Sequence, residues 1–408
     1  MVLALGSGFA QVIALAFSPI ITRLYSPSDF AVITMFLTIT GMLLPFICGK
    51  YEVAIVVAGT DRHASELTAL SCWIAATGTL ILSVVVITSW QSINSALGFV
   101  ELGRWLLLVP VAVFLGALAM IGRYVANRRS EYRLISRYMF VQAMMSVGMN
   151  LWFGWLGWGA TGLLVANVVA VGLGTSWLLW TLRHSMKKIG YADAHALRTV
   201  AYKYRDFPLM NASSSVLDTL TLAMPVFFIA RMFSQDTVGF YGLLTRVAQA
   251  PLSLVSGAVT QVHLKHISDL VRERQPVVSY LLRITLFLMI FVIPPMVLLL
   301  LWAPDLFAWA FGQPWRGAGE LLAILIPSIA IQFVVSTVSP TCGATGNNQV
   351  GAVWKVLSFL VTLSMFLFVA PGLDIRDVMI ALATTNVVLY ALYFVAIIYS
   401  ARNPRYVH

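Results

Sequence analysis

Apolar residues fall into twelve long runs along the chain, separated by short polar or basic segments. Most runs reach the roughly 20 residues that an α-helix needs to cross the hydrocarbon core of a bilayer. The pattern therefore predicts an all-α integral membrane protein with twelve transmembrane helices. We place these helices at residues 3–22, 30–48, 66–88, 104–122, 138–154, 159–181, 209–230, 239–262, 280–302, 320–339, 350–370 and 377–399.

The basic residues lie almost entirely in alternate loops and their flanking helix ends. Of the 26 Lys and Arg, twenty lie on one side of the predicted membrane. The opposite side carries Arg23, Arg104, Arg231, Arg316 and Arg376. Because basic loops stay in the cytoplasm, we expect a multi-pass protein of the bacterial inner membrane with both termini cytoplasmic. The formal net charge of +10 then faces membrane lipids, and nucleic acid is not an expected partner.

Composition excludes a soluble protein and disfavours an enzyme. The 408 residues are 60% hydrophobic and only 10% charged, with a mean hydropathy of +0.87, which is too few charges to cover a soluble surface. The longest predicted outer loop, from Ala303 to Gly319, leaves no room for a catalytic domain. The pair His263 and His266 has no Cys or acidic neighbour at ligand spacing, so we expect no metal, cofactor or catalytic site.

The N-terminal segment and the cysteines agree with a membrane protein. Met1 runs straight into an apolar segment, without the basic stretch that opens a signal peptide. We therefore expect no cleaved signal, and a short cytoplasmic lead before this start. Cys48, Cys72 and Cys342 lie within spans or near the basic face, so no disulfide framework is predicted.

A hydrophilic stretch from Arg183 to Arg205 divides the twelve spans into two sets of six. We predict an N-terminal lobe at 1–182, a cytoplasmic linker at 183–207, which includes an amphipathic interfacial helix, and a C-terminal lobe at 208–408. The outer turns at residues 23–26 and 231–234 share the pattern Arg-apolar-aromatic-Ser, with an acid at the start of the next helix. An even number of spans in each half predicts a parallel repeat with its pseudo-twofold axis along the membrane normal.

Two predicted spans carry a charge on a polar helix face. The first face has spacing 0, 3, 7, 10 and consists of Asn211, Ser214, Asp218 and Thr221. The second has spacing 0, 3, 7, 10, 14 and consists of Arg246, Gln249, Ser253, Ser256 and Thr260. At about 1.5 Å per residue, Asp218 lies about 15 Å from the cytoplasmic end of its predicted span, which is mid-membrane. Arg246 lies about 10 Å from the outer end of its own span. Charges at these depths should face protein or a wet cavity.

Two interpretations of Asp218 and Arg246 stay open. They form either a structural ion pair between adjacent helices or a cavity site in which Arg246 is a forked donor to a phosphate and Asp218 tunes it. Uncharged polar stripes on other spans include Gln142 and Asn150, which either line the same cavity or bond neighbouring helices.

Near the cytoplasmic ends, Lys50, Glu52 and Arg123 mark a mouth that collects an anionic lipid head. The alternative is simple contact with membrane lipids.

Six segments of the sequence carry a family-like pattern, at residues 22–30, 50–56, 157–163, 204–209, 226–234 and 238–254. Together they resemble the Wzx-type O-antigen and polysaccharide flippases of the multidrug/oligosaccharidyl-lipid/polysaccharide exporter superfamily. The resemblance covers essentially the whole chain.

The resemblance implies a bundle of two lobes that moves an undecaprenyl-pyrophosphate-linked oligosaccharide across the membrane, with a polysaccharide polymerase or chain-length machinery as a possible partner. Two alternatives remain. A cation-coupled multidrug exporter of the same superfamily would favour acidic cavities, whereas a membrane glycosyltransferase or polymerase would need a large outer loop.

Overall fold

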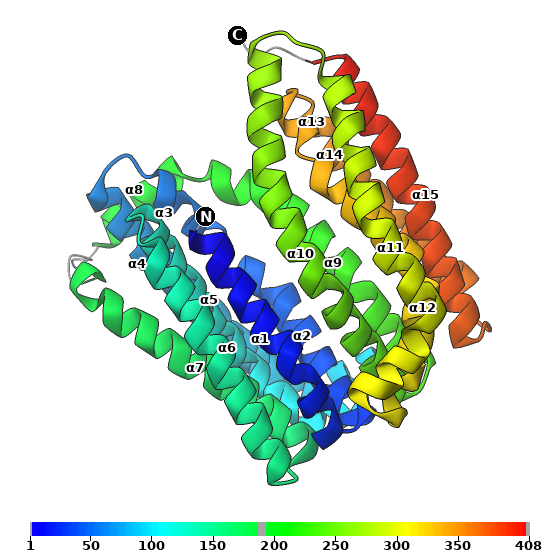
Figure 1. The fold of residues 1–408 in the computed structure, drawn as a ribbon. Coiled ribbons are helices and arrows are strands. Elements are labelled where there is room, and N and C mark those ends of the chain that lie inside the picture. Colours follow the sequence, from blue (N-terminus) through cyan, green and yellow to red (C-terminus); the bar gives the residue numbers. More distant parts are fainter. Residues whose placement is uncertain (1, 187–192, 405–408) are drawn as a thin grey trace. The chain divides into compact units, whose positions relative to one another are not determined.

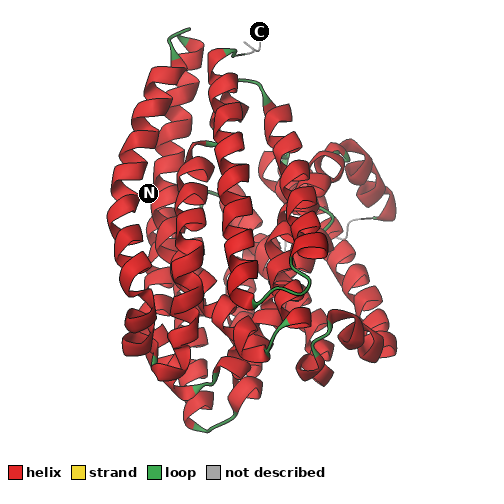
Figure 2. Cartoon of the chain, turned by 90° about the vertical axis from the view of Figure 1, so that its right-hand side faces the viewer, coloured by secondary structure: helices red, strands yellow, loops and turns green. Residues whose placement is uncertain are grey.

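The computed structural model describes the backbone of residues 2–186 and 193–404, and the side chains of these residues except 2–5, 7, 100, 184–186 and 209–214. Helices joined by short loops make up the described part, in which no strand occurs (Figure 2). Two units divide the chain, Met1–Gly239 and Phe240–His408. Each unit is described separately.

The first unit contains α1 to α9 and the start of α10 (Figure 1). Its elements are α1 (Val2–Leu24), α2 (Pro27–Ile47), α3 (Tyr51–Val57), α4 (Asp61–Leu97), η1 (Val100–Leu108), α5 (Val109–Arg128), α6 (Tyr132–Trp155), α7 (Gly159–Met186), α8 (Ala194–Lys203) and α9 (Asp206–Met232). Helix α1 packs along α6, and α6 packs against α7, which also contacts α5. Helix α9 packs against α2.

The second unit contains the rest of α10 (Gln235–Arg272) and all later elements. They are α11 (Val277–Phe311), η2 (Gln313–Trp315), α12 (Arg316–Val338), α13 (Thr341–Ala344), α14 (Asn348–Ser364), η3 (Met365–Val369) and α15 (Ile375–Arg402). Helix α12 packs between α11 and α15, and the buried side chains of Leu281, Phe333 and Ile397 join their core.

Nine of the twelve predicted spans lie wholly within helical residues, and the spans 30–48, 320–339 and 350–370 each run one residue past a helix end, which confirms the all-helical membrane fold. Nine helical segments in the described chain are long and apolar enough to cross a bilayer, and the predicted spans in α1, α6 and α10 are helical but are not among these nine. Helix α11 continues to Phe311, so much of the loop predicted from Ala303 to Gly319 is helical. The division into two lobes of six helices stays a prediction.

The outer turn between α1 and α2 shows why helix α2 begins where it does. Ser26 is the N-cap and accepts a hydrogen bond from the backbone N–H of Asp29, whose carboxylate accepts one from the backbone N–H of Ser26. Pro27 occupies the first helical position, as predicted. Asp29 also accepts a hydrogen bond of 2.7 Å from the backbone N–H of Ala160 in the first turn of α7. One carboxylate therefore satisfies the open ends of two helices.

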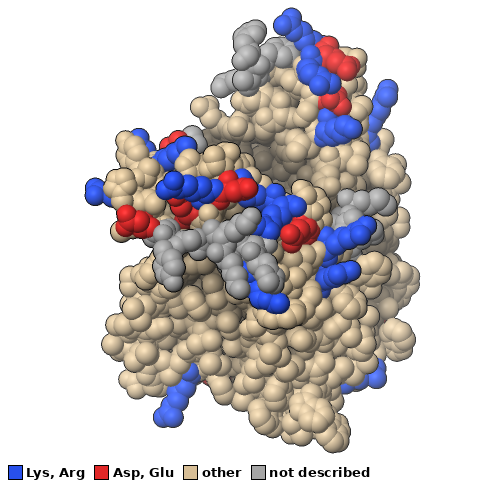
Figure 3. Space-filling model, turned by 90° about the vertical axis from the view of Figure 1, so that its left-hand side faces the viewer, with Lys and Arg blue, Asp and Glu red and all other residues tan. Residues whose placement is uncertain are grey.

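Basic side chains gather at one end of the first unit. On the face shown in Figure 3 they form a band across that end, where α3, α8 and the start of α4 lie. The residues at this end include Lys50, Arg62, Arg128, Arg129, Arg133, Arg198 and Lys203. We call it the basic end. It is the end at which α1 and α6 begin and α5 and α7 finish.

Candidate functional site

The predicted mouth is built around a chain reversal between α2 and α3. Helix α2 ends at Ile47, and the next residues, Gly49 and Lys50, have φ values of 63° and 62°. This left-handed conformation is open to glycine and unfavourable for lysine. It turns the chain so that Glu52 falls in the first turn of α3, where it is 1% exposed.

Glu52 has a buried carboxyl group, one oxygen of which makes no hydrogen bond to the described residues. Its Oε2 atom has no hydrogen-bond partner among the described residues. Burial raises the pKa of Glu52, while a backbone hydrogen bond and the nearby charge of Lys50 act in the opposite direction. A carboxyl in this setting favours its neutral form and can take up a proton at a higher pH than an exposed one.

Arg123 belongs to the same region. It lies on α5, and its Nε atom is buried without a hydrogen-bond partner in the described chain. The charges of Arg123 and Glu52 both act on the hydroxyl of Tyr124. Lys50, Glu52 and Arg123 therefore lie in one region of the first unit, and their role as a mouth for an anionic lipid head stays a prediction.

Arg128 holds this region in place, a role that the sequence did not reveal. Its Nη1 donates to the carbonyl oxygens of Ile55, Val56 and Ala58 at 3.1, 3.4 and 2.7 Å. Its Nη2 donates to Asp61 at 3.0 Å. A single guanidinium therefore caps the end of α3 and ties the start of α4 to the end of α5.

Helix α8 and the residue that follows it, Tyr204, pack against the same region. Tyr204 belongs to one of the segments that resemble the flippases, and its hydroxyl makes one of these contacts. The Tyr51 hydroxyl donates to the carbonyl of Ala201 at 3.2 Å, and the backbone N–H of Gly59 donates to the Tyr204 hydroxyl at 3.4 Å. Val200 is 1% exposed and packs into the core below. A helix therefore lies at Ala194–Lys203 and packs on protein through Val200, and its place at the membrane interface stays a prediction.

Asp218 lies near the middle of α9 and is half-buried. The side chain of Asn211, predicted on the same face, lies outside the described side chains. Asp218 belongs to the first unit and Arg246 to the second, so their pairing stays a prediction.

Arg246 and Gln249 lie on α10 and are both exposed. Within the described part of its own unit, no ion pair or hydrogen bond engages the Arg246 guanidinium. Further along the same helix face, Ser256 accepts a hydrogen bond of 3.0 Å from Thr337, and Thr260 donates to the Thr337 carbonyl at 3.2 Å. The polar face of α10 is thus open at Arg246 and closed against α12 beyond it.

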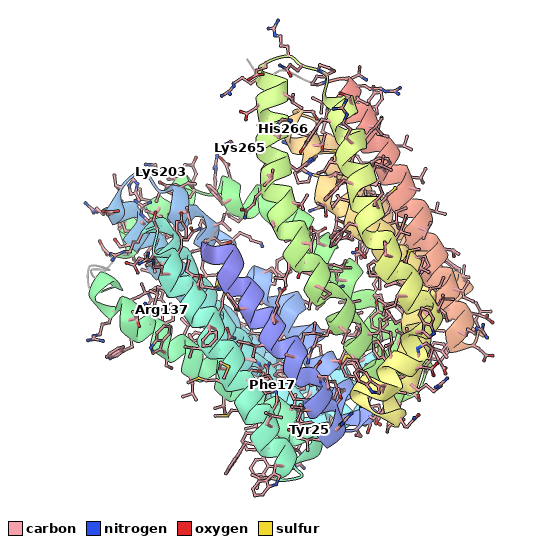
Figure 4. The ribbon with its side chains drawn as sticks, viewed as in Figure 1. Phe17, Tyr25, Arg137, Lys203, Lys265 and His266 are labelled. Atoms are coloured by element: carbon pink, nitrogen blue, oxygen red, sulfur yellow. The ribbon has the colours of Figure 1, made fainter. Side chains whose placement is uncertain are left out.

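Gln142 and Asn150 lie at helix contacts instead. The side chain of Gln142 lies beside Gly174 of α7. The carbonyl of Asn150 accepts a 2.7 Å hydrogen bond from the Tyr25 hydroxyl, and its side-chain amide donates to Ser146 at 3.5 Å. Figure 4 labels Tyr25 at the lower end of α1. The contact with α7 favours a helix-packing role for Gln142. The side chain of Asn150 bonds within α6, and its buried Oδ1 atom has no hydrogen-bond partner in the described chain, so both interpretations of Asn150 stay open.

Solved transporter structures share this fold. An inward-facing multidrug resistance MATE family transporter of the MOP superfamily matches with a TM-score of 0.73 and 15% identity over 97% of this chain and 95% of that one. An inward closed structure of the lipid II flippase MurJ gives 0.73 and 13% over 97% and 87%. The Vibrio cholerae MATE transporter VcmN in its bent form gives 0.52 and 15% over 98% and 95%. At these identities the matches show the fold alone.

Sequence comparison assigns the family. A search of curated protein sequences finds no significant match. The sequence profile described as "Polysaccharide biosynthesis protein" matches residues 20–320, well over half of the chain. The chain therefore belongs to the polysaccharide biosynthesis protein family.

Proposed function

We propose that the protein is a flippase that carries an undecaprenyl-pyrophosphate-linked oligosaccharide, an O-antigen or another surface polysaccharide repeat unit, from the cytoplasmic to the periplasmic leaflet of the bacterial inner membrane. The observation that carries this proposal is the family match over residues 20–320. The fold shared with a lipid II flippase supports it. The basic end of the first unit would face the cytoplasm, as would both termini.

Arg246 is the residue we assign to the diphosphate. Arg246 is an exposed residue of α10, and its guanidinium presents a planar fork of donors that matches a phosphate. Gln249 is exposed one turn further along and would bond the sugar, together with Asn211 of α9. Asp218 would compete for Arg246 when substrate is absent. Gln142 is a weaker candidate because its side chain lies against α7, whereas Asn150 keeps a side-chain oxygen without a hydrogen-bond partner in the described chain and would bond the sugar.

The mouth residues divide between two roles in this proposal. Lys50 and Arg123 would attract the anionic head of the lipid, since both are cationic and lie in the region around Glu52. Glu52 is negative when ionised and would repel a diphosphate. Its burial suits a proton site better than a ligand for the substrate.

Alternating access completes the mechanism. The cavity would open to the cytoplasm, bind the diphosphate at Arg246, and release the glycolipid on the periplasmic side after the units rock. The polyprenyl tail would stay in lipid throughout. A polymerase or chain-length machinery would then take up the translocated unit.

A cation-coupled multidrug exporter is the second candidate, because a MATE transporter matches the fold equally well. Cationic drugs would be repelled by Arg246 and favour acidic cavities. The family match and the exposed arginine both favour an anionic, lipid-linked substrate.

The decisive experiment uses a strain that lacks the gene and carries wild type, Arg246→Ala or Arg402→Ala. Arg402 is an exposed arginine in the last turn of α15 and serves as the charge-matched control. We would measure surface polysaccharide, the lipid-linked intermediate on the cytoplasmic side and the protein level in the membrane.

We expect deletion to abolish surface glycan and to build up the lipid-linked intermediate. We expect Arg246→Ala to do the same at normal protein level, and Arg402→Ala to restore wild-type glycan. Unchanged surface glycan in the deletion strain would reject the flippase and favour the drug exporter. Full rescue by Arg246→Ala would reject the diphosphate site.

A further inference from the structure

A pocket of about 400 Å³ opens where α1, α6 and α7 of the first unit meet. Its walls are apolar and come from Phe9 of α1, Phe140 and Val141 of α6, and Trp177 of α7. Phe9 is 62% and Phe140 46% exposed, so the pocket opens outward from the helices. In a membrane such a surface meets lipid chains.

One end of the pocket is closed by direct contact between two helices. Gly6 of α1 lies against Ser136 of α6 so closely that a side chain at Gly6 would overlap it. The two helices are in direct contact at this point, near the start of each. This contact forms one wall of the pocket. The wall lies at the basic end.

A charged residue stands at this closed end. Arg137 lines the pocket and is exposed (Figure 4). Arg133 is exposed one helical turn earlier on α6. Among the residues that the structure describes, no acid forms an ion pair with either arginine, and the neighbouring Glu131 pairs with Arg129 at 4.0 Å. Both guanidinium groups are therefore available to an external anion.

Helix α7 carries a further cation in its last turns. It ends where α6 begins, and its Arg183 stacks over Trp180 at 4.2 Å from the ring centre. Trp180 is 62% exposed, as expected of an aromatic side chain at a membrane interface. The apolar pocket thus has Arg137 in its lining and Arg133 one helical turn away, while α7 contributes Trp177 to its wall.

We propose that this groove binds one anionic phospholipid, with its phosphodiester on Arg137 and Arg133 and one acyl chain in the pocket between Phe9, Phe140 and Trp177. The arginine stem can pack along the apolar wall while its charged head reaches the lipid phosphate. A free anion would leave the apolar wall bare. A second copy of the chain would have to bring carboxylates to neutralise the arginines. The lipid satisfies both parts of the groove at once.

The test measures which lipids stay bound. Protein in nanodiscs of equal parts phosphatidylglycerol and phosphatidylethanolamine is transferred to detergent, and retained lipids are counted by native mass spectrometry. We expect wild type to retain phosphatidylglycerol preferentially. Arg137→Gln should lower its retention about fivefold, as expected for one arginine near a charged lipid. Retention of phosphatidylethanolamine should not change.

Three further variants complete the design. Phe140→Ala should lower the retention of both lipids because it opens the apolar wall. Arg133→Gln repeats the charge test at a second position if Arg137→Gln does not fold. Arg402→Gln, which changes an exposed arginine of the second unit, should behave as wild type.

Equal retention of the two lipids by wild type would overturn the proposal, as would an Arg137→Gln result that matches Arg402→Gln. A dimer that forms without retained lipid and is abolished by Phe140→Ala would show that a second copy fills the groove, and would also overturn it. The assay involves no transport, so its failure would leave the proposed flippase function standing.

Discussion

Gly239 in the first turns of α10 lies directly against the carbonyl oxygen of Pro27, the first residue of α2. No side chain fits between them, because a β-carbon on Gly239 would overlap that carbonyl. Gly239 is the last residue of the first unit, and the helix continues into the second unit without a break. The starts of α2 and α10 are therefore locked together by a backbone contact.

Replacing Gly239 by alanine should destabilise the protein. The backbone oxygen of Pro27 cannot rotate away, so one of the two helices must shift, which we expect to cost about 1–3 kcal/mol. The measurement is the melting temperature in detergent, together with the yield of monodisperse protein. Gly257→Ala on the same helix is the matched control, because a β-carbon there meets nothing within 4 Å. Equal melting temperatures for the two variants would contradict the predicted clash.

The hydrophobic pattern predicted the helices well, and the physical reason is simple. A chain in lipid must satisfy every backbone hydrogen bond internally, so each apolar run of sufficient length becomes a helix. Helix α3 was not predicted from the hydrophobic pattern, because a helix of seven residues is too short to cross the bilayer. Its position depends on the positive φ values at Gly49 and Lys50 and on the distant Arg128. Such a dependence on remote residues leaves no periodic trace in the sequence.

The candidate site was predictable only in part. Periodicity shows that Gln142 and Asn150 share one face of α6, but it does not show whether that face meets a cavity or another helix. The contact of Gln142 with Gly174 and the hydrogen bond from Tyr25 to Asn150 come from the packing of three helices. Lys50 and Glu52 were easier to place together because they are neighbours in sequence. The relation of Asp218 to Arg246 depends on long-range placement and stays a prediction.

Glu52 should make stability depend on pH. Burial raises the pKa of Glu52 above its ordinary value of 4.5. The folded protein therefore keeps this proton over a pH range in which the unfolded chain has lost it. The free energy of unfolding should fall as pH rises from 4.5 through the raised pKa, by about 1.4 kcal/mol for each pH unit that separates the folded pKa from the unfolded one.

The pH test compares wild type with Glu52→Gln and Glu131→Gln in melting experiments from pH 4.5 to pH 8. Glu52→Gln should flatten the dependence and melt higher than wild type at the alkaline end, because glutamine carries no charge to bury. Glu131→Gln retains the buried Glu52 and should keep the wild-type slope. A Glu52→Gln variant with an unchanged slope would assign the pH dependence to another group.

Arg128→Ala should loosen α3 and the turn into α4. The substitution leaves the carbonyls of Ile55, Val56 and Ala58 without their donor, in a part of the protein where Arg128 is only 19% exposed. We expect a loss of about 1–3 kcal/mol, typical of hydrogen bonds from a charged donor. Hydrogen–deuterium exchange over residues 51–60 should rise in the variant. Arg129→Ala removes an exposed neighbour and should change exchange little, and an equal effect of both substitutions would argue against the cap.

Asp218→Asn tests whether the carboxylate on α9 couples transport to a proton or cation. Asparagine keeps the size and hydrogen bonding of the residue but cannot ionise. If protonation or cation binding at Asp218 drives the return step, flipping in proteoliposomes should fall, on the order of tenfold for a typical coupling energy, and should lose its dependence on the proton gradient. Asp206→Asn, exposed in the first turn of the same helix, is the control and should transport as wild type. Full transport by Asp218→Asn with an unchanged gradient dependence would remove Asp218 from the coupling mechanism and leave it as a structural residue of α9.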